Sequence, residues 1–204
     1  MSESSNQNFN HLKIHSQYSI CEGAIKIDDL QDFSKLNKIR SLALCDTSNL
    51  CGALEFAEKI SKVGTQPIIG TQINFKYGDS IGLLPLFALN EEGYKRIIKL
   101  SSTSYLENNE LYEPHVDFND LLDDNTGVAI FSGTIFGLFG ELFNKGKFRE
   151  ISELYKKLKF KFGDRFYIEI QRHNDHNELG FEKFNLNKSL ELEIPIIATN
   201  EVFY

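Results

Sequence analysis

Short apolar segments of β-strand type recur along this chain and alternate with segments whose apolar residues follow helical spacing. This alternation limits the fold more than any other feature of the sequence. Apolar strands that alternate with helices are typical of parallel β-sheet buried beneath helices, so we expect an α/β layered fold or barrel. The expected strands cover residues 10–15, 41–45, 67–75, 83–89, 127–131, 165–170 and 194–199.

The clearest helix is expected over residues 147–162, where apolar side chains fall on one stripe. Three more helices are expected from shorter apolar patterns, and Asn90 followed by two glutamates is a plausible helix cap. The stripe of the first helix contains Phe148, Ile151, Tyr155, Leu158 and Phe162. The shorter patterns are Leu30, Phe33 and Leu36, then Leu54, Ala57 and Ile60, then Tyr94, Ile97 and Ile98.

The size and composition are those of a single globular domain. The chain has 204 residues, 41% of them hydrophobic, which can bury a substantial core. We expect residues 1–8 to be a disordered leader and residues 9–204 to form one domain. Three cysteines without Cys-x-x-Cys spacing are expected to be small buried residues in a reducing cytoplasm. No apolar run is long enough to cross a bilayer, so no membrane partner is expected.

The charge balance argues against a surface that grips nucleic acid. The net charge is -7, from 22 basic and 29 acidic residues, whereas DNA-binding domains carry a basic footprint. An acidic block spans residues 107–124 and a basic block spans residues 145–165. Each block is interpreted as a solvated loop or helix face, and the alternative is a surface that binds a partner.

Polar residues with metal-ligand chemistry follow several of the predicted strands. In parallel α/β folds the working residues lie at the carboxyl ends of the strands. Histidines and carboxylates that converge there suit a multinuclear metal site that hydrolyses phosphoesters. The alternative is that these side chains cap helices or bond loops, and Asp46, Thr47 and Ser48 could cap the next helix.

Five segments of the chain resemble, in order and spacing, the PHP domain that begins the bacterial DNA polymerase III alpha subunits, the replicative C-family DNA polymerases. The resemblance runs from about Phe9 to Tyr204, nearly the whole chain. The segments are HLKIHSQYSICEGAIKIDDL, LALCDTSNLCGALEF, QPIIGTQINF, YIEIQRH and PIIATNEVFY.

The resemblance implies a PHP-type distorted seven-stranded β/α barrel, expected to be incomplete at its C-terminal end within these residues. It implies that this chain is the amino-terminal part of a longer DNA-directed DNA polymerase, a nucleotidyltransferase of DNA replication. The partners would be the remaining polymerase domains and a proofreading exonuclease subunit. DNA, and Mg²⁺ as cofactor, would bind elsewhere in that longer chain, and this domain itself would need no cofactor.

The metal-binding pattern of the family carries over only in part. The opening His-x-His motif falls on Lys13 and His15, and the Asp-His pair after the second strand falls on Asp46 and Thr47. The acidic ligand after the third strand is replaced by an amide, and the closing Asp-x-His motif keeps only its carboxylate. The remaining positions of the pattern are Gln72, His173, Glu201 and Phe203.

These substitutions predict a degenerate site with no catalytic residues and no bound metal cluster. An ammonium group offers only donors and adds positive charge beside a metal. We therefore expect a scaffold that docks partners, with Lys13 taking the place of the ion and bonding Asp46 or Glu201. The alternative function is a metal-dependent phosphoesterase, such as a 3′-5′ exonuclease or pyrophosphatase, with the reduced ligand set His15, Asp46, His173 and Glu201.

Overall fold

The computed structural model describes residues 9–107, 113–173 and 175–204. The expected leader, residues 1–8, lies outside these described residues, as does Glu110 of the acidic block. No helix within the described ranges is long and apolar enough to cross a membrane.

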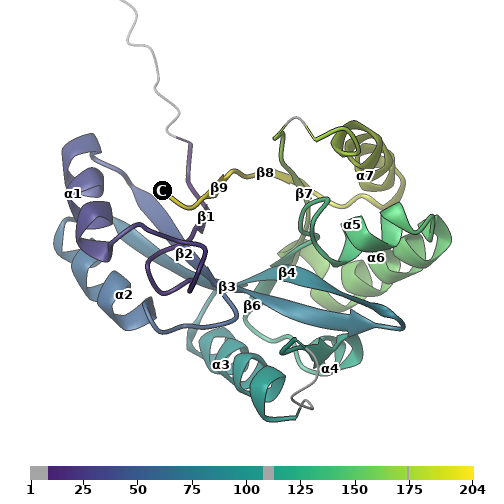
Figure 1. The fold of residues 1–204 in the computed structure, drawn as a ribbon, viewed down its shortest axis with the longest axis horizontal. Helices are drawn as coiled ribbons and strands as arrows, with labels where there is room; N and C mark the ends of the chain where they lie inside the picture. Colours follow the sequence, from purple (N-terminus) through teal and green to yellow (C-terminus); the bar gives the residue numbers. More distant parts are fainter. Residues whose placement is uncertain (1–8, 108–112, 174) are drawn as a thin grey trace, which may run out of the picture.

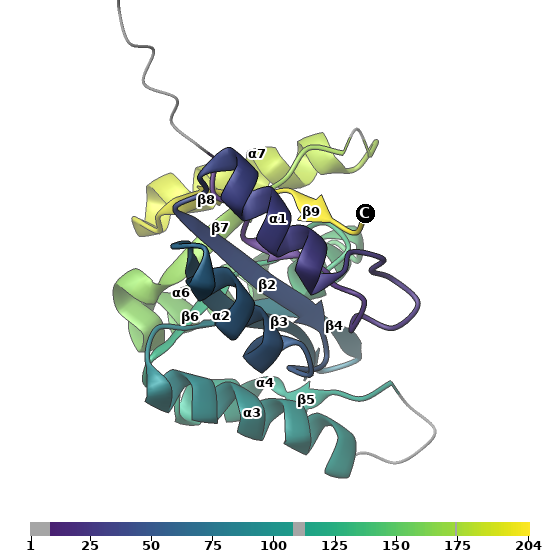
Figure 2. The same ribbon diagram turned by 90° about the vertical axis from the view of Figure 1, so that its left-hand side faces the viewer.

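The strands form a curled mixed sheet and a separate two-stranded sheet, with helices packed around the outside (Figures 1 and 2). The large sheet has the order β2-β3-β4-β6-β7-β8, and β5 pairs with β3 off this path. In the small sheet β1 and β9 run parallel, and β1 also contacts β2. The strands are β1 (Lys13–Ile14), β2 (Ser41–Thr47), β3 (Gln66–Tyr77), β4 (Ser80–Ala88), β5 (Val116–Asp117), β6 (Val128–Phe131), β7 (Phe166–Ile170), β8 (Ile196–Ala198) and β9 (Glu201–Val202).

All seven predicted strands are present, and the predicted α/β barrel-type fold is confirmed as a curled, incomplete barrel. The expected parallel pairing is found for β2 with β3, β6 with β7 and β7 with β8. It was wrong for β4, which runs antiparallel to both β3 and β6. The reason is a two-residue hairpin at Gly78 and Asp79, between the paired residues Tyr77 and Ser80. Gly78 has φ +61°, the left-handed conformation that such tight hairpins require.

Seven α-helices are described, and they surround the strands on the outside of the curled sheet (Figure 1). Figure 2 shows α1 and α2 side by side, and their packing against each other is also seen in their contacts. The helices are α1 (Ile27–Asn37), α2 (Ala53–Lys62), α3 (Glu91–Leu106), α4 (Phe118–Asp123), α5 (Leu138–Asn144), α6 (Phe148–Phe162) and α7 (Glu178–Leu192), and a 3₁₀ turn covers Gly163–Arg165.

Three apolar clusters hold the layers together. The largest lies between the sheet and α3 to α7, and it includes Phe75, Phe139 and Tyr155. A second cluster lies between β2 and the pair α1 and α2. The third lines the concave side of the strands and contains Ala43, Cys45, Phe87, Ala129 and Phe131. The polar site described below lies next to this small inner cluster.

The predicted phase of α6 is confirmed along most of its length. Ile151, Tyr155, Leu158 and Phe162 are buried, while Phe148 at the first turn is 46% exposed. Lysine side chains of the basic block face outward, as expected for a solvated helix face.

The apolar stripes predicted for the shorter helices were partly wrong. In α1 the exposed side chains include Phe33 and Leu36, and in α2 Leu54 is exposed. The buried faces are instead formed by Ile27, Leu30 and Ser34 in α1 and by Ala53, Phe56 and Ile60 in α2. A few apolar residues at helical spacing fit two adjacent phases, and packing against β2 selects one of them.

Two smaller predictions had opposite outcomes. The cap at α3 is confirmed, because the Asn90 side chain accepts a hydrogen bond of 2.9 Å from the backbone N–H of Gly93. The expectation that all three cysteines are buried was wrong. Cys45 is buried in the inner cluster, whereas Cys21 and Cys51 lie exposed on loops.

Candidate functional site

The polar site forms where β1 and β9 pair at the mouth of the inner cluster. Their parallel register places Lys13 directly beside Glu201. The Lys13 Nζ lies 3.3 Å from Glu201 Oε1 and 3.5 Å from Glu169 Oε1 at the end of β7. Lys13 is only 1% exposed, so this ammonium lies inside the protein between two carboxylates.

The Lys13 ammonium remains charged in this setting. Burial alone lowers the pKa of Lys13, but attraction to Glu169 and then to Glu201 outweighs burial and raises that pKa above its ordinary value. A buried charge is tolerated only when it is paired and hydrogen-bonded, and both conditions hold here.

Glu201 contacts three polar side chains of the site, those of Lys13, His15 and Gln72. Its Oε1 is 3.0 Å from His15 Nε2 and accepts a hydrogen bond of 2.7 Å from Gln72 Nε2. Burial would raise the pKa of Glu201, but the His15 hydrogen bond and the Lys13 charge hold it at about 2. The carboxylate is therefore fully ionised at neutral pH, and the prediction that Lys13 pairs with Glu201 is confirmed.

Glu169 is held on the opposite side of Lys13 by residues of two strand ends. Gln171 Nε2 donates to Glu169 Oε1 at 3.0 Å, and the hydroxyl of Thr199 donates to the same oxygen. Glu169 lies in the YIEIQRH segment and was not among the residues expected at the site. The signal was available, because a carboxylate within the apolar run of β7 has to meet a positive partner when it is buried.

Of the two expected partners of Lys13, Glu201 forms the pair and Asp46 does not; the alternative that Asp46 caps α2 was wrong. Its Oδ1 accepts from the backbone N–H of Ser16 at 2.6 Å and from the hydroxyl of Ser19 at 3.0 Å, and its Oδ2 accepts from the Ser16 hydroxyl at 2.9 Å. Helix α2 begins only at Ala53. The two serines lie in a turn after β1, and sequence spacing gave no sign that this turn folds onto Asp46.

His15 is enclosed by neighbours and its ring has no open face toward solvent. It is 0% exposed and stacks on Phe203, with ring centroids 4.5 Å apart and an interplanar angle of 19°. Its Nδ1 lies 3.3 Å from Ser19 Oγ and 3.5 Å from Thr47 Oγ1. The structure thus brings together Lys13, His15, Thr47, Gln72, Glu201 and Phe203.

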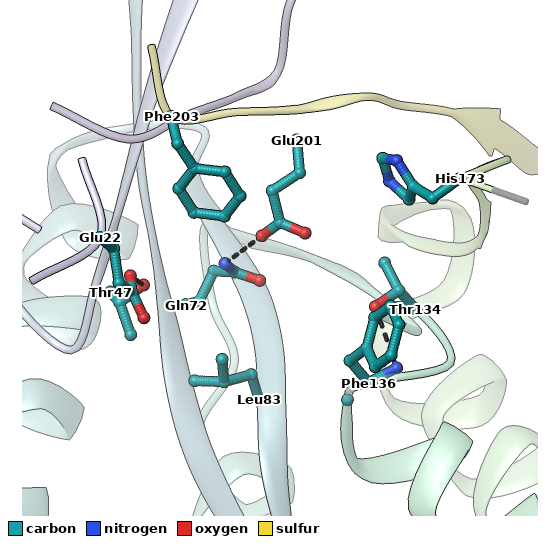
Figure 3. A pocket seen from close by; sticks show the side chains of 11 residues that line it. Glu22, Thr47, Gln72, Leu83, Thr134, Phe136, His173, Glu201 and Phe203 are labelled. Carbon is teal, nitrogen blue, oxygen red and sulfur yellow. Dashed lines mark hydrogen bonds between the residues drawn. The ribbon is translucent and has the colours of Figure 1, made fainter. Parts of the chain in front are cut away.

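His173 is separated from this group by a cleft, and the expected eight-residue site is therefore divided. Figure 3 shows His173 facing Glu201 and Phe203 from the other wall. Its Nε2 is 2.8 Å from Gln171 Oε1, which ties it to the Glu169 side. The cleft has a volume of about 310 Å³, and its lining also includes Glu22, Leu83, Thr134 and Phe136.

The donor set does not fit a metal cluster. A cluster needs lone pairs and anions, but the central position holds an ammonium, and Gln72 directs its Nε2 toward Glu201. Within the described ranges no three His, Cys, Asp or Glu side chains converge as metal ligands. The site is a buried network of ion pairs in which one ammonium contacts two carboxylates.

Comparison with known proteins places this geometry in a family. The sequence model of the PHP domain matches residues 11–173. The DNA polymerase III alpha subunits of Caulobacter vibrioides and Rickettsia felis are 35% and 36% identical to the chain, over 100% and 96% of its length. The alpha subunit of Vibrio cholerae is 30% identical over 98% of the chain. The chain spans 16% to 18% of the lengths of these relatives.

Solved structures share the fold at low sequence identity. An amidohydrolase from Chromobacterium violaceum, solved with sulfate and no metal, aligns with a TM-score of 0.58 and 11% identity, covering 95% of this chain and 87% of the other. A Bifidobacterium adolescentis protein described as a metal-dependent phosphoesterase aligns with a TM-score of 0.51 and 13% identity, covering 96% and 88%. From the family match and these relatives, the chain belongs to the PHP domain family and corresponds to the amino-terminal PHP domain of bacterial DNA polymerase III alpha subunits.

Proposed function

We propose that this chain is the PHP domain of a replicative DNA polymerase and acts there as a scaffold without catalytic activity of its own. The polymerase relatives, about six times as long as the chain, support a longer parent protein. In that parent protein, DNA binding, the Mg²⁺ cofactor and nucleotidyl transfer belong to other domains. A cytoplasmic location follows from the same proposal.

The observation that carries the proposal is the Lys13 ammonium between Glu169 and Glu201. A divalent cation in this position would face a fixed positive charge at contact distance, a repulsion that is strong in a buried site. The two carboxylates that would attract the cation already share the positive charge of Lys13. The domain therefore lacks the electrostatic setting in which a metal lowers the pKa of water for phosphoester hydrolysis.

A polymerase that contains a scaffold domain of this kind needs a proofreading activity from another protein. A polymerase whose PHP domain cannot remove misincorporated nucleotides depends on a separate exonuclease. We propose that the partners of this domain are the remaining domains of the polymerase chain and that proofreading exonuclease subunit. A pull-down assay with the purified chain and the proofreading exonuclease of the same organism tests the second partnership. Failure of the exonuclease to bind the chain at micromolar concentration would count against it.

The alternative function is a metal-dependent phosphoesterase, and it is favoured by the fold shared with a protein described in those terms. Its reduced ligand set would be His15, Asp46, His173 and Glu201. The geometry weakens this candidate. Both carboxylate oxygens of Asp46 are bonded to serines, and His173 bonds Gln171 on the far wall of the cleft.

A nuclease assay separates the two functions. The purified chain is incubated with labelled 3′-ended DNA and, separately, with a small phosphodiester, in Mn²⁺ or Zn²⁺. The scaffold predicts no release of nucleotide above the rate of a His15→Ala variant. Release that disappears in the His15→Ala variant would establish the phosphoesterase.

A further inference from the structure

A small cavity lies between the end of β7 and helix α7, next to the carboxylate that pairs with Lys13. Its volume is about 10 Å³, close to the smallest space that accepts one water molecule. Polar side chains from three segments contribute to its walls. They include Thr134, Glu169, Gln171, Glu178 and Asn185.

Two of these residues have a polar atom that is buried without a hydrogen-bond partner. Glu169 is 2% exposed and Asn185 is 1% exposed. The unpartnered atoms are Glu169 Oε2, an acceptor, and Asn185 Nδ2, a donor. Leaving a buried polar group unpaired is unfavourable, so two such atoms in residues that line one cavity point to a ligand.

The chemistry of the two atoms selects the ligand. Asn185 Nδ2 needs an acceptor, which excludes a metal ion or an ammonium ion at this point. Glu169 Oε2 is a carboxylate oxygen and needs a donor, which excludes a halide. Water both donates and accepts, and it matches the volume of the cavity. We propose that this cavity is a binding site for one structural water molecule, which donates to Glu169 and accepts from Asn185.

The water connects the ion pair network to the outer helices. Asn185 Oδ1 already accepts a hydrogen bond of 2.9 Å from the hydroxyl of Tyr155 in α6, and Tyr155 is fully buried. Glu169 Oε1 faces Lys13 on the other side. The site therefore extends a polar path from Lys13 through Glu169, the water and Asn185 to Tyr155. It supplies a donor to Glu169 Oε2, whereas the contact with Lys13 is made through Oε1.

A crystal structure of the whole chain at high resolution tests the proposal. Crystals are grown in rubidium bromide, so that either ion would give an anomalous signal. The proposal predicts one peak without anomalous signal, within hydrogen-bond distance of Glu169 Oε2 and Asn185 Nδ2. An anomalous peak, an empty cavity, or a direct bond between the two side chains would each overturn it.

Two double variants test whether the Asn185 side chain holds the water. Tyr155→Phe removes the other partner of Asn185 and should leave the water in place. Adding Asn185→Leu to Tyr155→Phe should expel the water, whereas adding Asn187→Leu, at an exposed position of the same helix, should not. Water that persists in the Tyr155→Phe, Asn185→Leu protein would contradict the assigned donor. If the Asn185→Leu protein does not fold, the structure of the unmodified chain still decides.

Discussion

Lys13 and Glu201 are direct partners in the register of two parallel strands, and their charged groups lie 3.3 Å apart inside the protein. The backbone pairing of β1 and β9 thus fixes a lysine beside an acid that would otherwise repel Glu169 across the same space. Two clustered carboxylates without a cation would drive one of them toward protonation. The lysine supplies that cation as part of the chain.

Replacing Lys13 by Met, which keeps much of the side-chain length but removes the charge, should strongly destabilise the fold. The loss leaves Glu169 and Glu201 as uncompensated buried carboxylates, for which we expect a decrease of about 3–5 kcal/mol in the free energy of unfolding. Urea denaturation monitored by circular dichroism measures this quantity. Adding Glu169→Gln and Glu201→Gln should recover part of the loss.

The matched control for this substitution is Lys156→Met on α6. Lys156 is 51% exposed and pairs with Glu153 at the surface, where such pairs contribute roughly 0–1 kcal/mol. Equal stability losses for Lys13→Met and Lys156→Met would mean that the buried ion pairs do not support the fold.

The free energy of unfolding should decrease in acid because Glu201 becomes protonated. Its pKa is about 2 in the folded protein, against an ordinary value of 4.5. Because the folded pKa is the lower one, the folded state binds fewer protons, and the contribution is present above pH 4.5 and is lost as the pH falls toward 2. A difference of this size corresponds to on the order of 3 kcal/mol.

Urea denaturation at a series of pH values between 6 and about 2 reveals this effect. Glu201→Gln should flatten the pH dependence across that interval, whatever its effect on stability at neutral pH. An unchanged slope in the Glu201→Gln protein would show that the acid sensitivity comes from other carboxylates.

Only two of the three cysteines should react with a thiol reagent in the native protein. Burial raises the pKa of the Cys45 thiol well above its ordinary value, and the side chain is inaccessible in the inner cluster. Cys21 and Cys51 are exposed. Mass spectrometry after maleimide treatment at neutral pH should find labels on these two alone, and on all three in urea. Native labelling of Cys45 at a similar rate would mean that the inner cluster is open.

The apolar face of α6, and not its charges, should carry the packing energy. Leu158 is 0% exposed in the largest cluster, and Leu158→Ala should lower the free energy of unfolding by about 2–5 kcal/mol. Lys157→Ala, at an exposed neighbouring position, should change it by less than about 0.5 kcal/mol. Comparable losses in the two variants would contradict the observed orientation of the helix.

The sequence allowed the strands and the best helix to be predicted because their apolar patterns are long enough to fix a phase. The seven predicted strands and the α6 stripe are of this kind. Strands β5 and β9 were missed, since each contains only two residues and exists through its pairing partner. The same dependence on tertiary contacts explains the misassigned stripes of α1 and α2.

The site was predicted in part for a similar reason. Lys13 and Glu201 could be paired in advance because the family pattern places both at ligand positions. The partners of Asp46 and the role of Glu169 depend on how the turn after β1 folds and on which way β7 faces the interior. Both features are tertiary. The apolar run of β7 indicates that a buried Glu169 needs a positive partner, but no local pattern of residues identifies that partner or the fold of the turn.

The central claim is that the Lys13 ammonium stands where a metal ion would lie in this family. Elemental analysis of the chain, purified without chelators and dialysed against Mn²⁺ or Zn²⁺, tests it most directly. As a positive control, Lys13→His, Thr47→His, Gln72→Glu and Phe203→His together restore metal-ligand residue types at the substituted positions. We expect the native chain to retain no stoichiometric metal and the four-residue variant to retain it. Stoichiometric metal in the native chain that is lost in the Glu201→Gln variant would contradict it.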